Sequence, residues 1–146
     1  MYSSSVNDMA RLSVHAMLHA AHAVQDEVET RLNGIGLSGA KFAALKALSD
    51  AAESLPLGQL AERLSCVKSN ITQLVDRLEA DGLVARKPDP RDRRTKLAVL
   101  TAAGRKAVKE GGRMVESAER EVLSRLTRDE AQQLSSLLGK IGTPNR

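Results

Sequence analysis

The sequence predicts a mainly α-helical fold with a small two-stranded β-wing. Apolar residues recur every three or four positions through most of the 146 residues, which is the spacing of amphipathic helices. The alternation typical of strands is confined to residues 83–87 and 95–100, with the turn-forming, highly charged segment 88–94 between them. The length is typical of one domain, so we expect a single domain over residues 1–146.

Apolar spacing and end signals delimit four helices before the strands. The first helix ends at Gly34 and Gly36, and we expect Gly34 in the left-handed conformation. Ser38 is placed to cap a second helix, and Pro56 fits the first turn of a short third helix. A fourth helix follows a turn at 65–66 and closes at 81–82. The apolar positions of these helices are Met9, Leu12, Ala16, Ala20, Val24, Val28, Leu32, Phe42, Leu45, Leu48, Leu57, Leu60, Ala61, Leu64, Val67, Ile71, Leu74, Val75 and Leu78.

Two more helices follow the strands. Thr101 caps a fifth helix, in which Gly111 and Gly112 mark either a weak point or a place where another helix comes close. The segment from Thr127 to Glu130 is a capping box at the start of a last helix, which stops before Pro144. We therefore expect long helices at about 8–34 and 102–141, on either side of a compact unit at about 38–100.

The order helix, helix, ribbon between residues 57 and 100 predicts a winged helix-turn-helix. Polar and basic side chains of the fourth helix lie opposite its apolar side, and most of them are in its first half. Short amide and hydroxyl groups can read base edges in the major groove, and basic groups can bind guanine or phosphate. The expected DNA-binding residues of this helix are Lys68, Ser69, Asn70, Thr72, Gln73 and Arg77.

Basic charge is concentrated in the same part of the chain. The net charge is +4, yet residues 63–106 hold eleven basic and five acidic side chains, which leaves the rest of the chain at −2. Asp89 and Asp92 are expected to position the arginines of the wing, whose tip suits a narrow minor groove. A solvated surface loop is the alternative, and the location directly after a polar-faced helix disfavours it. The expected wing residues for DNA are Arg91, Arg93, Arg94 and Lys96.

Five segments form a pattern that resembles the MarR family of bacterial transcriptional regulators. They are LAERL at 60–64, SNITQLVDRLE at 69–79, GLV at 82–84, DPRDRR at 89–94 and LTAAG at 100–104, and the last two are the most specific. The resemblance extends over the whole chain and is tightest at about 57–104. It implies a homodimer built by the first, fifth and sixth helices, with two winged modules on a pseudo-palindrome. Members of this family are usually repressors that a small ligand or oxidation releases from DNA, so the resemblance implies the same for this chain.

The amphipathic end helices independently support a dimer. They carry more apolar surface than one small winged module covers, and an exposed stripe on the last helix would leave a patch of a kind that monomers avoid. Two-fold symmetry would place the two half-sites about 34–36 Å apart. The alternative is that these helices pack within one subunit. The expected interface residues are Leu12, Val122, Leu134, Leu137, Leu138 and Ile141.

Three histidines and one cysteine leave a sensing role open. His15, His19 and His22 share one side of the first helix, and histidines four residues apart can bind a metal. No carboxylate or thiol motif of matching spacing accompanies them, so we favour interface or surface imidazoles, with an effector pocket lined by one or two of them as a further alternative. Cys66 begins the fourth helix near Lys68, a position that favours a reactive thiol. Because related oxidation sensors usually carry their cysteine in the first helix, a small packed residue is the favoured role.

Composition and motifs exclude several other classes. One cysteine excludes a disulfide framework and a multi-cysteine zinc site, and two aromatic residues, Tyr2 and Phe42, argue against a protein that stacks single-stranded bases. The absence of a nucleophile motif and of a phosphate-binding glycine loop argues against an enzyme, and we expect neither a cofactor nor a metal. Without a long apolar run or a signal peptide, we expect a cytoplasmic protein with no membrane partner.

The expected partners are double-stranded DNA, a second copy of the chain and a small-molecule effector. Two alternatives to an effector-controlled regulator stay open. One is a constitutive architectural DNA-binding protein, which no ligand or oxidant would release. The other is a protein-interaction module that uses the winged fold without DNA.

Overall fold

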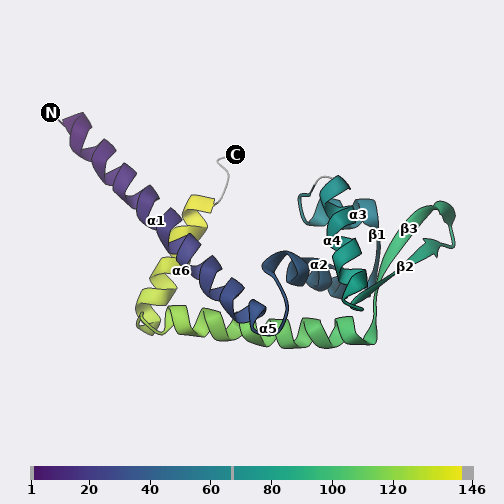
Figure 1. The fold of residues 1–146 in the computed structure, drawn as a ribbon. Helices are drawn as coiled ribbons and strands as arrows, with labels where there is room; N and C mark the ends of the chain where they lie inside the picture. Colours follow the sequence, from purple (N-terminus) through teal and green to yellow (C-terminus); the bar gives the residue numbers. More distant parts are fainter. Residues whose placement is uncertain (1, 67, 143–146) are drawn as a thin grey trace.

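The computed structural model describes residues 2–66 and 68–142, and it places a winged helix-turn-helix at one end of a long helix (Figure 1). That long helix is α5, and α1 and α6 lie toward its other end. The three strands form one antiparallel sheet in the order β1-β3-β2. The elements in chain order are α1 (Tyr2–Asn33), α2 (Gly39–Asp50), β1 (Ser54–Pro56), α3 (Leu57–Arg63), α4 (Lys68–Ala80), β2 (Val84–Asp89), β3 (Asp92–Leu100), α5 (Ala102–Leu123) and α6 (Arg128–Gly142).

The hydrophobic core lies inside the winged module. It is continuous from the end of α1 through α2, α3 and α4 to the sheet, and its large side chains are excluded from water. By contrast, α6 has no buried residue, and the first half of α1 extends away from the body of the chain. The winged module therefore has a core of its own, and the end helices lie mostly outside it. The largest fully buried side chains are Leu32, Leu45, Leu48, Leu60, Ile71, Val75 and Leu78.

Side-chain caps begin three helices where the sequence predicts them. The hydroxyl of Ser38 accepts a hydrogen bond from the backbone N–H of Lys41 at 3.1 Å, and Thr101 accepts one from Gly104 at 3.0 Å. At the start of α6, Glu130 accepts from the N–H of Thr127 at 2.9 Å, and Thr127 accepts from the N–H of Glu130 at 3.2 Å. The pKa of the Glu130 carboxyl is lowered, first because the backbone N–H of Thr127 donates to the carboxylate and second through a hydrogen bond with the side chain of Thr127; both favour the charged form.

Three helices end in the same hydrogen-bonded motif, and this corrects the expectation for Gly34. At the end of α1 the left-handed residue is Gly36, with φ +78°, while Leu37 donates back to the carbonyl of Leu32 at 2.9 Å. Gly36 itself donates to the carbonyl of Asn33 at 3.1 Å. The same pair of bonds closes α4, with Gly82 as the left-handed residue at φ +75°, and α3, with Ser65 at φ +52°. In this motif the left-handed residue comes directly before the residue whose N–H donates across the last turn. Since that donor is Leu37, the left-handed residue is Gly36 and not Gly34.

The sheet is larger than the predicted ribbon. Pro56 is not in the first turn of α3: it ends β1, whose residues pair with β3 from Ser54 opposite Val99 to Pro56 opposite Leu97. Because β1 is an edge strand, proline is tolerated there. The charged segment between the expected strands is also mostly strand, since β2 continues to Asp89 and β3 begins at Asp92. The wing therefore ends in a tight turn, not in a long loop.

The glycine pair in α5 marks a close approach of another helix. A Cβ at Gly111 would overlap the ring of Phe42 on α2, whereas a Cβ at Gly112 would meet nothing within 4 Å. This confirms the close approach and places it at Gly111. α5 can thus lie directly on α2, which joins the winged module to the long helix. In the described residues, no helix is both long and apolar enough to cross a membrane.

Candidate nucleic-acid interface

The fourth helix presents a polar side to solvent because its apolar side is fixed in the core. Ile71, Val75 and Leu78 are at most 2% exposed. The side chain of Lys68 lies outside the described part of the structure, as does Val67. The other predicted DNA-binding residues of α4 are all exposed: Ser69, Asn70, Thr72, Gln73 and Arg77. An exposed helix with amide and hydroxyl groups on its outer side has the shape and chemistry for the major groove.

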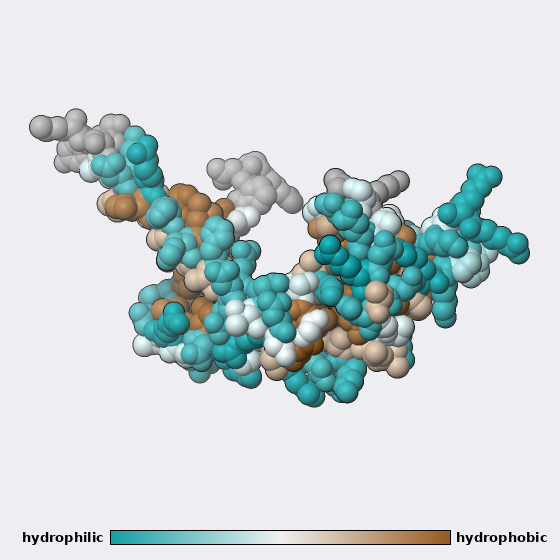
Figure 2. Space-filling model, viewed as in Figure 1, coloured by the Kyte–Doolittle hydropathy of each residue, from teal (hydrophilic) through white to brown (hydrophobic). Residues whose placement is uncertain are grey.

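The wing projects from the module as a strongly hydrophilic arm (Figure 2). Its four predicted cations are exposed: Arg91, Arg93, Arg94 and Lys96. Asp89 accepts a hydrogen bond from the backbone N–H of Arg91, and Asp92 accepts one from that of Arg94, both at 3.0 Å. The two carboxylates thus hold the backbone of the turn, and they influence the direction of the arginines through that backbone.

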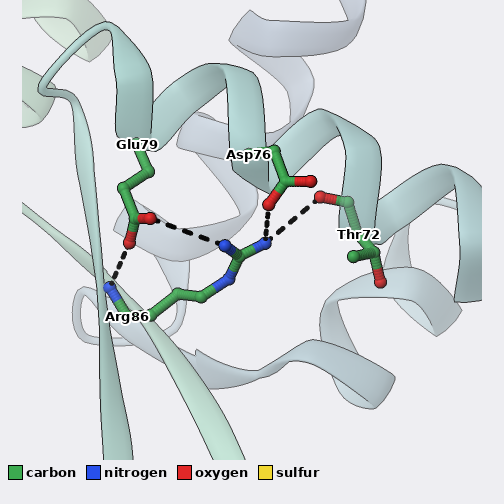
Figure 3. Close-up of polar contacts among 4 residues, drawn as sticks. All are labelled: Thr72, Asp76, Glu79 and Arg86. Carbon is green, nitrogen blue, oxygen red and sulfur yellow. Dashed lines mark hydrogen bonds and ion pairs between the residues drawn. The ribbon is translucent and has the colours of Figure 1, made fainter.

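Arg86 joins the wing to α4, and it is the residue of this site that sequence reasoning missed (Figure 3). Its guanidinium forms ion pairs with Asp76 and Glu79, and its backbone N–H donates to Glu79 at 3.2 Å. In the sequence Arg86 counts only toward the basic excess. A usable signal was present: two carboxylates on the outer side of a helix expected to meet DNA require a nearby cation.

A cleft of about 670 Å³ lies between α3, α4 and the wing. Its lining includes the free thiol of Cys66 together with Arg94 and Lys96 from β3. Cys66 is half-buried, and its sulfur contacts the carbonyl of Leu64 at 3.6 Å. The structure therefore brings Cys66 close to the wing, an association that the sequence did not indicate.

The histidines of α1 lie away from the winged module. His15, His19 and His22 are all exposed, and His15 borders a shallow hollow with Asp8 and Arg11. Among the residues that the structure describes, no three His, Cys, Asp or Glu side chains are grouped to hold a metal ion. A separate cavity of about 280 Å³ lies where the α1–α2 turn meets α5, and none of the three histidines lines it.

Among the described residues, the large apolar side chains that are exposed lie on α1, α5 and α6. Leu12 on α1 is 70% exposed, and Val122 on α5 is half-buried against α1, in a cavity of about 310 Å³. The four predicted interface residues of α6 are 41–64% exposed: Leu134, Leu137, Leu138 and Ile141. Within the single chain, then, the apolar stripe of α6 is not covered.

Comparison with known proteins identifies the family. Residues 35–95 match the model of the MarR family. HTH-type transcriptional repressor Mb2911 of Mycobacterium bovis is 31% identical over 120 residues, which cover 82% of this chain and 86% of that protein. The chain belongs to the MarR family. This MarR-family chain is also 43% identical over 72 residues to the transcriptional activatory protein BadR of Rhodopseudomonas palustris, an alignment that covers 48% of the chain and 41% of BadR.

Solved structures of MarR proteins share the fold. The apo form of wild-type MarR from E. coli has a TM-score of 0.77 at 25% identity, over 88% of this chain and 95% of that chain. A MarR mutant from E. coli complexed with operator DNA has the same TM-score and identity, over 94% and 97%. This MarR-family chain is a DNA-binding transcriptional regulator and not an enzyme.

Proposed function

We propose that this regulator is a homodimeric repressor, acting in the cytoplasm, that binds a pseudo-palindromic operator and is released by a small ligand or an oxidant. The observation that carries the proposal is the pairing of an exposed polar helix with a projecting basic wing on one module. A groove-sized helix and a cationic arm contact neighbouring grooves of one duplex.

In this proposal α4 enters the major groove and the wing follows the adjacent minor groove. Ser69, Asn70, Thr72 and Gln73 face the base edges, since they are exposed and lie toward the start of the helix. Arg77 and Lys68 bind guanine or phosphate. The wing cations neutralise phosphate and enter the minor groove, and Asp89 and Asp92 hold the turn that carries them.

Gln73→Ala tests the reading of bases. Binding is measured by mobility shift on the gene's own upstream region and on variants changed at single base pairs. If Gln73 reads a base, the substitution reduces discrimination at that position by about 1–3 kcal/mol. Gln133→Ala, an exposed amide on α6, is the control and should change nothing. Equal weakening for every sequence would remove Gln73 from base reading.

The dimer proposal treats residues 1–146 as one domain, with dimerisation helices at about 8–34 and 102–141. Its support is the uncovered apolar stripe of α6 and the exposed apolar residues of α1. Replacing both Leu137 and Ile141 by glutamate should yield monomers in sedimentation velocity and weaken operator binding, while the core of the single chain stays intact. Ser136→Glu adds charge on the opposite side of α6 and should stay dimeric. Dimers that persist in the double variant would refute this interface.

Repression and release are tested separately from binding. Mb2911 is named a repressor and BadR an activatory protein, so a reporter driven by the upstream region, with and without the regulator, decides the direction. Release is supported by the cavity between the α1–α2 turn and α5 and by the cleft at Cys66. Release from the operator is measured by repeating the mobility shift with peroxide and with panels of small aromatic acids. Operator affinity that no ligand or oxidant changes would favour the constitutive architectural protein instead.

A further inference from the structure

Two carboxylates occupy the side of α4 that is proposed to face DNA. Asp76 lies seven residues after Ser69 and three after Gln73, so it shares their side of the helix. Glu79 lies one turn further on, toward β2. Asp76 and Glu79 have 57% and 45% of their side-chain surface exposed. Carboxylates facing a phosphate backbone oppose binding through like-charge repulsion, so this site requires a compensating cation.

Arg86 supplies that cation from the opposite element. One guanidinium nitrogen, Nη2, donates to Asp76 Oδ1 at 2.5 Å and to the main-chain carbonyl of Thr72 at 3.2 Å. The other, Nη1, donates to Glu79 Oε1 at 3.5 Å. Only 24% of the Arg86 side chain is exposed, and Figure 3 shows it extending across the gap from β2 to α4. A planar guanidinium can bind several acceptors along α4 at once, because its N–H donors diverge in one plane.

The position of Arg86 in the ribbon makes this contact a brace. Arg86 lies opposite Ala98, which is fully buried, and the turn of the wing lies only a few residues further along β2. Beyond this point the ribbon is exposed on both strands, apart from a few half-buried residues. Arg86 therefore ties the wing to α4 through hydrogen bonds and ion pairs at the point where the ribbon leaves the body of the module.

We propose that Arg86 is a positioning residue for DNA binding, which sets the wing at a fixed angle to α4 and neutralises Asp76 and Glu79, without contacting DNA. Its guanidinium is directed at protein acceptors on α4, so its charge is used within the protein. This inference rests on the proposed docking of α4 and the wing. It separates Arg86 from the wing-tip arginines, which act on DNA directly.

A double-mutant cycle measures how Arg86 acts. The probe is a 30-base-pair duplex selected from a random library by the wild-type protein, and affinity is read by fluorescence anisotropy. Arg86→Met should weaken binding about tenfold in the wild-type background. In the Asp76→Asn/Glu79→Gln background the same substitution should cost less than about threefold, because no carboxylates remain to be neutralised. The same loss in both backgrounds would mean that Arg86 contacts DNA itself, and would overturn the proposal.

A matched control and a second variant keep the cycle informative. Lys46→Met removes a cation that pairs with Asp50 on α2, outside the interface, and should change affinity less than twofold in both backgrounds. Arg86→Gln keeps hydrogen-bonding capacity without charge, and it replaces Arg86→Met if that variant does not fold.

The brace is also measured without DNA. Backbone ¹⁵N relaxation of Arg86→Met should show lower order parameters at residues 91–94 than in the wild type, while core amides such as that of Val75 stay unchanged. Unchanged order in the wing would refute the brace. If the wild-type protein selects no duplex, the proposed function fails, and this relaxation measurement then decides the positioning role alone.

Discussion

Gly111→Ala should destabilise the chain although alanine is the better helix former. A Cβ at this position would lie 2.7 Å from Cε2 of Phe42, closer still to Cδ2 of the same ring, and 3.3 Å from Cδ1 of Leu37. Gly111 is buried, so the ring can be relieved only by moving α5 away from α2 or by turning Phe42 out of its place. The substitution therefore changes the joint between the long helix and the winged module.

The magnitude follows from two opposing terms. Overpacking a well-filled site costs about 1–3 kcal/mol, and replacing glycine by alanine within a helix gains about 0.5–1 kcal/mol. The difference is a net loss of about 0–2.5 kcal/mol, with a middle value of about 1 kcal/mol. For a chain of this size, a loss of about 1 kcal/mol lowers Tm by about 2–4 °C. Circular dichroism at 222 nm during heating measures Tm, at one protein concentration because association shifts it.

The neighbouring glycine is the matched control. A Cβ at Gly112 meets nothing within 4 Å, so Gly112→Ala should keep only the helix gain, about 0.5–1 kcal/mol, and raise Tm. The two adjacent substitutions thus have opposite signs. Should Gly111→Ala be as stable as Gly112→Ala, the close approach of α2 to α5 would be wrong.

Three further predictions concern the wing, a turn and a cap. Arg94→Ala should weaken DNA binding and reduce the slope of log affinity against log salt by about 0.9, and an unchanged slope would show that Arg94 touches no phosphate. Ser65→Gly should raise the free energy of unfolding by about 0.5–1 kcal/mol, because Ser65 holds φ +52° at the end of α3, where α1 and α4 use glycine. The change is measured as a higher midpoint of urea unfolding, and a lower midpoint would contradict it. Thr127→Ala should raise the pKa of Glu130 only part of the way toward its usual range in an NMR titration, since it removes the side-chain hydrogen bond but keeps the backbone N–H of residue 127, which is the larger cause; an unchanged pKa would show that the hydroxyl has no part in it. In the wild type, the contribution of this charged cap is present above the ordinary glutamate range and is lost as pH falls through the lowered pKa.

Local signals predicted the helices well because their causes are local. A cap such as Ser38 or Thr101 bonds an N–H three residues away, so the spacing in the sequence already contains the interaction. The choice between Gly34 and Gly36 was harder. Both glycines permit a left-handed residue, and the bond from Leu37 to Leu32 selects Gly36.

The third strand was missed for a different reason. Residues 54–56 are too few to show alternation, and they become a strand only because β3 lies alongside them. The same limit applies to Arg86. Its partners lie seven, ten and fourteen positions earlier in the chain, on a different element, and no spacing rule connects them.

From its order of residues, this chain could be assigned its helices, its caps, the polar side of α4 and the basic wing, since each depends on interactions within a few positions. Three features could be found only in the tertiary structure: the ion pairs of Arg86 with Asp76 and Glu79, the close approach of Phe42 to Gly111, and the pairing of β1 with β3. All three join segments that meet only when the core closes, and their geometry depends on how the helices and the sheet pack against one another.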